Sequence, residues 1–181
     1  MERSIALIAI FAALIAALGF LPSFMLGWGV PITAQSLGVM LAGTVLGAVR
    51  GGLAVLLFVV LVALGLPLLA GGRGGLGIFA SPTAGFVIGF PIAAFTAGFV
   101  MEQLQRTPVA LAAGIAAAIG GVLVLYIFGV VGFMMVVQKG AWESTAILAA
   151  YIPGDFIKVV LTGMITAALY RARPDSILSR A

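Results

Sequence analysis

The chain of 181 residues is strongly apolar: hydrophobic residues make up 64% of it and charged residues only 8%, with a mean hydropathy of +1.32. A soluble domain cannot bury so much apolar surface, so the composition excludes a soluble globular protein and predicts a membrane protein. The absence of Cys and His excludes disulfides, thiolate catalysis and Ser-His or Cys-His catalytic arrangements. The net charge of +4 bears on orientation in the membrane and gives no argument for nucleic-acid binding.

Long apolar runs divide the chain into six predicted helical spans. The runs are continuously apolar, whereas the strands of a membrane β-barrel alternate in hydrophobicity. Residues 22–31 hold two Pro, two Gly and Trp28, which predict a loop near the lipid headgroups. We expect residues 1–181 to form a single all-α transmembrane domain, in which the first run is a span and not a signal peptide. The expected spans are 4–21, 34–49, 52–69, 84–102, 108–130 and 144–170.

The distribution of basic residues predicts that both termini are cytoplasmic. Six spans place the two termini on one side of the membrane, and cytoplasmic loops carry an excess of Lys and Arg. With the termini inside, only Arg73 and Lys139 lie outside, and Lys158 falls within a span. The arginines then on the cytoplasmic side are Arg3, Arg50, Arg106, Arg171, Arg173 and Arg180.

The first span carries rows of alanine. Ala9, Ala13 and Ala17 repeat every four residues, with Ala12 and Ala16 beside them. Small residues at this spacing let two helices approach closely. The rows fit packing inside the bundle, docking of a partner protein or a homo-oligomer, and the residues alone do not choose between these.

A Gly-rich loop (residues 66–83) joins the third and fourth spans. Five of the seven residues 71–77 are Gly, and residues 72–77 match the GxGxxG pattern of dinucleotide-binding folds. That reading needs a βαβ unit with an acidic residue about 20 positions on, and here the next acid is Glu102 at the far end of the fourth span. A flexible connector and a lid over a ligand remain. We expect the lid, because glycines allow a close backbone approach and the loop faces the same side as the Pro153–Asp155 segment.

The last span contains an acidic and a basic residue in apolar surroundings. Asp155 and Lys158 are three positions apart, so both side chains lie on one face of a helix, close enough to pair or to bind one ligand together. A charge at mid-membrane costs about 2.5–3.5 kcal/mol on the insertion scale, and such residues usually face the bundle interior. The pair therefore predicts a polar pocket, with a purely structural ion pair as the alternative.

Four segments together resemble the BioY family, the biotin-binding S components of energy-coupling factor (ECF) transporters. They cover nearly the whole chain in the family's order: residues 30–47, 64–77, 81–90 and 152–158. The resemblance implies a six-helix S-component bundle with an external biotin pocket and a lid. It also implies three kinds of partner: biotin, a transmembrane coupling subunit and cytoplasmic ATPases. The chain departs from the family pattern at Phe86, where Tyr is expected, and at Ser81-Pro82, where Gly-Pro is commoner.

The resemblance also suggests which residues bind biotin. Asp155 would accept from a ureido N–H, Lys158 would donate to the ureido oxygen or to the valerate carboxylate, and Gln35 would both donate and accept. Arg73 in the lid would either attract the valerate or face solvent. The expected ligand-binding residues are Asp155, Lys158, Gln35, Arg73, Gly74, Gly75, Thr83 and Phe86, with Thr33 as a lesser candidate and Phe79, Phe90 and Trp142 as further wall residues.

Biotin uptake across the cytoplasmic membrane is the function we expect, with no enzymatic activity, no metal and no cofactor. An S component for another vitamin is an alternative within the same class. A small intramembrane enzyme would need Asp155 as a base, but no His, second carboxylate pair or nucleophile motif accompanies it. A membrane scaffold or channel would explain the alanine rows but neither the lid nor the buried pair.

Overall fold

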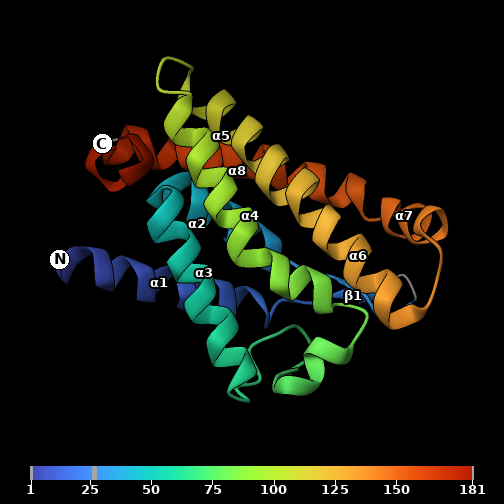
Figure 1. The fold of residues 1–181 in the computed structure, drawn as a ribbon. Coiled ribbons are helices and arrows are strands. Elements are labelled where there is room, and N and C mark those ends of the chain that lie inside the picture. Colours follow the sequence, from blue (N-terminus) through green and yellow to red (C-terminus); the bar gives the residue numbers. More distant parts are fainter. Residues whose placement is uncertain (1, 26–27, 181) are drawn as a thin grey trace.

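The computed structural model describes residues 2–25 and 28–180, and these fold mostly into helices (Figure 1). Residues 26–27, in the predicted headgroup loop, lie outside the described residues. The α-helices are α1 (Glu2–Leu18), α2 (Gln35–Leu46), α3 (Ala48–Ala63), α4 (Ala84–Gln103), α5 (Val109–Ala117), α6 (Leu125–Val137), α7 (Ala141–Ala149) and α8 (Ile152–Ala172). A π-helical segment, η2 (Ala118–Val124), makes α5 and α6 one continuous helix, and short 3₁₀ turns form η1 (Leu76–Ala80), η3 (Pro174–Ser176) and η4 (Leu178–Arg180).

Two short strands precede α2. Strand β1 (Phe24–Met25) pairs antiparallel with β2 (Pro31–Ile32), in the register Phe24 to Ile32. The pairing extends one residue beyond the predicted headgroup loop, in which Trp28 is half exposed and has a positive φ of 55°. This hairpin leads the chain directly into the first turn of α2.

Three of the predicted spans are helices long and apolar enough to cross a membrane: Ala84–Gln103, Val109–Val137 and Ile152–Ala172. The other three, α1, α2 and α3, are apolar but have only 17, 12 and 16 residues. A straight crossing needs roughly 20 residues, so length alone does not show that these helices span. The fold is a mostly helical membrane bundle in which three of the six predicted spans are short.

Several expected boundaries are wrong. The run 144–170 is not one helix, because α7 ends at Ala149 and α8 begins at Ile152 with Pro153 in its first turn. Proline has no N–H to donate, so it is tolerated at a helix start and breaks a helix interior. The run 52–69 is shifted: α3 begins at Ala48 and ends at Ala63, before Gly65 with a φ of 104°. The fifth span continues to Val137 instead of ending at residue 130.

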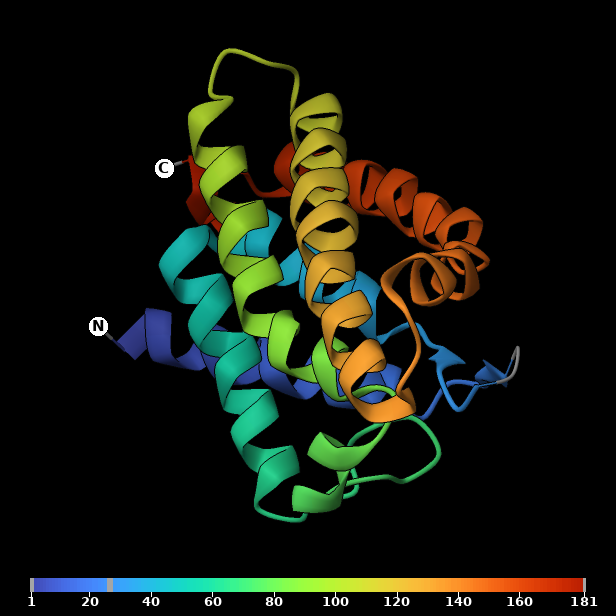
Figure 2. The same ribbon diagram turned by 45° about the vertical axis from the view of Figure 1, so that its right-hand side comes forward.

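Helix α4 lies at the centre of the bundle and contacts α2, α3, α5 and α6. Glycines allow these close contacts: a Cβ on Gly85 would lie 2.1 Å from the Phe128 carbonyl oxygen, and one on Gly98 would lie 2.3 Å from the Ala48 nitrogen. Helix α1 runs across α3 and α4 rather than along them, as both views show (Figure 1, Figure 2). The contacts at Gly85 and Gly98 show that small residues determine how closely the membrane helices pack.

The turn between α2 and α3 closes one end of the bundle. Gly47 adopts a φ of 85°, and the Glu102 carboxylate accepts a 2.8 Å hydrogen bond from the Ala48 N–H at the start of α3. The C-terminal turns pack on the same end, where the Ser179 hydroxyl donates to the Thr44 carbonyl at 2.5 Å. The opposite end of α2 begins at Gln35 and opens toward the Gly-rich loop.

Candidate functional site

A cavity with about 650 Å³ of empty space, part of it open to solvent, lies at the Gln35 end of α2. Its wall comes from β2, α2, the Gly-rich loop, α4, α6 and α8, so segments far apart in the sequence meet there. The lining residues are Val30, Pro31, Ile32, Thr33, Gln35, Ser36, Leu69, Arg73, Thr83, Phe86, Val87, Phe90, Leu125, Tyr126, Tyr151, Asp155 and Lys158.

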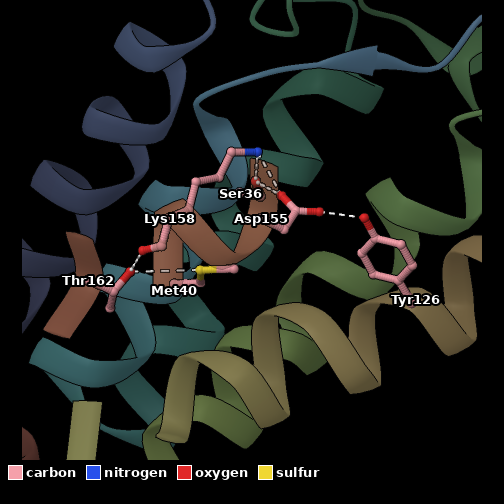
Figure 3. Close-up of polar contacts among 6 residues, drawn as sticks. All are labelled: Ser36, Met40, Tyr126, Asp155, Lys158 and Thr162. Atoms are coloured by element: carbon pink, nitrogen blue, oxygen red, sulfur yellow. Dashed lines mark hydrogen bonds and ion pairs between the residues drawn. The ribbon is translucent and has the colours of Figure 1, made fainter. Parts of the chain in front are cut away.

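Asp155 and Lys158 form an ion pair in the cavity wall (Figure 3). The Lys158 ammonium donates to Asp155 Oδ1 at 2.7 Å and to the Ser36 hydroxyl at 2.9 Å. The side chains of Lys158 and Asp155 are only 13% and 12% exposed. Helix α8 begins just before Asp155, so one helical turn carries both charges to the same face, as their spacing predicts.

Tyr126 completes this polar cluster from the opposite wall. Its hydroxyl donates to Asp155 Oδ2 at 2.5 Å, so both carboxylate oxygens have partners (Figure 3). The Phe86 ring contacts the Tyr126 ring edge to face, with centroids 5.7 Å apart, and holds it in place. Tyr126 is not among the residues predicted from the sequence, although it is the one hydrogen-bonding side chain in the run 109–137 and stands out there for that reason.

Gln35 lines the cavity, but its side-chain amide is occupied by backbone groups. Its Nε2 donates to the carbonyl oxygens of Ile15 and Leu68 at 3.1 and 3.0 Å. Its Oε1 accepts from the Ala70 N–H at 3.2 Å. The amide therefore joins α1 to the Gly-rich loop, and both of its donor hydrogens are used within the protein.

The Gly-rich loop brings Arg73 to the cavity. Residues Leu69 and Arg73 exchange two backbone hydrogen bonds, of 3.0 and 3.2 Å, and the Arg73 Nε donates to the Ala70 carbonyl at 3.1 Å. Partial burial lowers the pKa of the Arg73 guanidinium below its ordinary value, yet an arginine remains cationic at neutral pH. Arg73 is thus a cation at the loop side of the cavity.

The two expected loop glycines shape the loop and do not line the cavity. A Cβ on Gly74 would lie 2.2 Å from the Leu66 carbonyl oxygen, so no side chain fits there. Gly75 has a φ of 80°, and its N–H donates to the Val62 carbonyl at 2.8 Å. Thr83 does line the cavity, with its hydroxyl 2.8 Å from that of Ser81.

The aromatic residues divide between the cavity and other surroundings. Phe86 and Phe90 line the cavity as expected. Phe79 packs against the buried core, and Trp142 is 86% exposed on α7, so neither forms part of the wall. Two further wall residues were not predicted from the sequence: Tyr151, whose hydroxyl donates to the Val30 carbonyl at 2.9 Å, and Ser36.

The charges of the cavity suit a small ligand with one anionic group. Among the residues that the structure describes, three charged side chains line it, and the contact between Asp155 and Lys158 makes that pair neutral overall. Arg73 then leaves one positive charge at the loop side. The rest of the wall is largely apolar, so the site can bind an apolar body, a polar uncharged head and a carboxylate.

The chain is similar to known proteins over nearly its whole length. The family model described as "BioY family" matches residues 2–175. A protein of Rhodobacter capsulatus named "Biotin transporter BioY" is 57% identical, covering 99% of this chain and all of that one. A protein of Rhizobium etli with the same name is 48% identical, covering 95% of each chain.

A solved structure also has the same fold. It is described as the crystal structure of the S-component for biotin from an ECF-type ABC transporter, and the two superimpose with a TM-score of 0.88. The identity is 31%, over 94% of this chain and 92% of that chain. With the family model matching nearly the whole length, this chain belongs to the BioY family.

Proposed function

We propose that this chain binds biotin and mediates its uptake as the S component of an ECF-type ABC transporter. The observation that carries the proposal is a cavity lined, among the described residues, by one neutral ion pair and one further cation, Arg73, in a chain of the BioY family. The relatives named as biotin transporters match over nearly their whole length. The chain is a binding component of a transporter and not an enzyme.

Biotin matches the cavity group by group. Its ureido ring has two N–H donors and one carbonyl acceptor, which suit Asp155 as the acceptor and Lys158 or Ser36 as the donor. The thiophane ring is apolar and fits the wall made by Phe86 and Phe90. The valerate carboxylate would pair with Arg73. We also assign Thr83 and Thr33, which line the cavity, to ligand binding.

We assign six membrane helices to the bundle, in one domain, with the cavity and the Gly-rich loop outside and both termini in the cytoplasm. The excess of arginine at the opposite loops supports this orientation. Helices α1, α2 and α3 are short for a span, and non-helical backbone at membrane depth is tolerated where it lines a cavity. The stretch from β2 to Gln35 does line it.

The energy for uptake would come from partners, a transmembrane coupling subunit and cytoplasmic ATPases. The chain has no Gly-Lys-Ser/Thr loop with which to bind ATP itself. The alanine rows of α1 divide between two surroundings: Ala12 is buried in the bundle, whereas Ala9, Ala13 and Ala17 are exposed. We assign the exposed row (Ala9, Ala13 and Ala17) to docking of the coupling subunit, because small side chains leave a flat surface.

Calorimetric titration of the purified chain in detergent tests the binding function. Biotin should bind saturably without any partner, desthiobiotin should compete, and thiamine should give no heat. Biotin methyl ester, which lacks the carboxylate charge, should bind more weakly if Arg73 holds the valerate. A folded sample that gives neither heat nor thermal stabilisation with biotin would refute the proposal.

A further inference from the structure

Gln35 lies where three parts of the structure meet. Its side chain is 2% exposed, and its three hydrogen bonds reach Ile15 on α1 and Leu68 and Ala70 in the Gly-rich loop. Since an amide has two N–H donors, neither remains for a ligand. These contacts connect the end of α1 to the loop, and the connection runs through a residue at the start of α2.

A second observation places the same segments in direct contact. A Cβ on Gly19, just after α1, would lie 2.5 Å from the Leu68 carbonyl oxygen and 2.8 Å from the Gln35 Nε2. A methyl group therefore has no room at this point. The end of α1, the Gln35 amide and the loop are packed together without space between them.

The part of the loop held in this way carries the cavity wall. Leu69 and Ala70 are 5% and 3% exposed, and Leu69 and Arg73 both line the cavity. The two backbone hydrogen bonds between Leu69 and Arg73 make the intervening residues one tight turn. Whatever fixes Leu68 and Ala70 therefore fixes the position of Arg73 as well.

We propose that Gln35 is a positioning residue, which fastens the Leu68–Ala70 segment to the end of α1 and thereby holds the Gly-rich loop closed over bound ligand. This inference rests on the proposed function of the site. Release of ligand past this loop requires the three bonds of Gln35 to break. Their loss should act on the rate of release and leave the polar groups at Asp155 and Lys158 unchanged.

Two variants remove the contact by different means. Gln35→Met deletes all three hydrogen bonds with an uncharged side chain of similar length. Gly19→Ala changes no polar group but introduces the Cβ that meets Leu68 and Gln35. The matched control is Gly114→Ala on α5, where a Cβ would meet nothing within 4 Å.

Trypsin cleavage after Arg73 measures how readily the loop opens. Arg73 is the only Lys or Arg between Arg50 and Arg106, so trypsin cleavage after it gives fragments that mass spectrometry identifies without ambiguity. The experiment measures this cleavage on the full, ligand-free chain in detergent. In parallel, it measures the release of bound radiolabelled biotin after excess unlabelled biotin is added.

Both Gln35→Met and Gly19→Ala should release biotin about tenfold faster or more, since the first removes the hydrogen bonds between α1 and the loop and the second forces these segments apart. Both should also be cleaved faster after Arg73, and Gly114→Ala should behave as the parent. If Gln35→Met does not purify as a folded protein, Gln35→Glu replaces it; this change removes the two amide donors and keeps the acceptor for Ala70.

The inference is overturned if the variants release biotin and are cleaved at the rates of the parent. It is also overturned if Gln35→Met weakens binding while Gly19→Ala and the cleavage rates stay unchanged, since Gln35 would then contact ligand directly. A parent chain that does not bind biotin would refute the proposed function. The cleavage rates of the ligand-free variants would still decide whether Gln35 fastens the loop.

Discussion

A charge-neutral double substitution separates a ligand-binding ion pair from a structural one. The variants are Asp155→Asn, Lys158→Met and the two combined. Each single change leaves one buried charge without its partner, at sites only 12–13% exposed. Breaking a buried pair costs about 3–5 kcal/mol of stability, and we expect the lower end because Ser36 and Tyr126 remain as hydrogen-bond partners. The combined variant is uncharged, so it should regain most of that loss.

The expected loss of biotin affinity follows from the hydrogen bonds to the ligand and not from the contact between Asp155 and Lys158. If Asp155 and Lys158 each make one charge-assisted hydrogen bond to the ureido ring, each bond contributes about 1.5–3 kcal/mol. Losing both should weaken binding by about 100-fold to 10,000-fold. The combined variant should therefore approach the parent in stability and remain a poor binder.

Thermal unfolding in detergent and calorimetric titration on the same samples give the two quantities. The decisive sample is the combined variant. Relative to the single variants, it should be more stable but should bind biotin no better. If it binds biotin as tightly as the parent, Asp155 and Lys158 brace the helices and do not contact ligand. The assignment of the polar head to this pair would then be wrong.

Two further predictions concern the wall opposite the pair and the outer face of α1. Tyr126→Phe keeps the ring contact with Phe86 but removes the donor to Asp155, and it should weaken biotin binding about tenfold or more in the same titration; an unchanged affinity would show that Tyr126 does not position the carboxylate. Ala13→Trp places a large ring in the exposed row of α1, so the coupling subunit and ATPases should no longer copurify while biotin binding persists; intact copurification would place the docking surface elsewhere.

Much of the bundle and the central pair could be predicted because their signals are local. Apolar runs identify membrane helices wherever they lie in the fold, and three of the six predicted runs hold a long apolar helix, although a break after Ala149 divides the last run. Two residues three positions apart share a helix face whatever surrounds the helix, so Asp155 and Lys158 could be paired from spacing alone. The family could be recognised from four segments because their order and spacing are properties of the chain.

The remaining contacts of the site join segments that are distant in the sequence. Tyr126 lies 29 residues from Asp155, and Ser36 lies 122 residues from Lys158, so no local pattern joins them. Gln35 was predicted to bind ligand because its amide suits biotin, but no local pattern indicates that both of its N–H donors bond to backbone carbonyls 20 and 33 residues away.

The sequence by itself determined that this protein is a membrane bundle of the BioY family with a charged pair in its last span, since composition, spacing and motif order need no neighbours. Only the tertiary structure decided which polar atoms face the cavity and which are already bonded. Hydrogen-bonding groups buried away from water must find partners, and packing chooses those partners from anywhere in the chain.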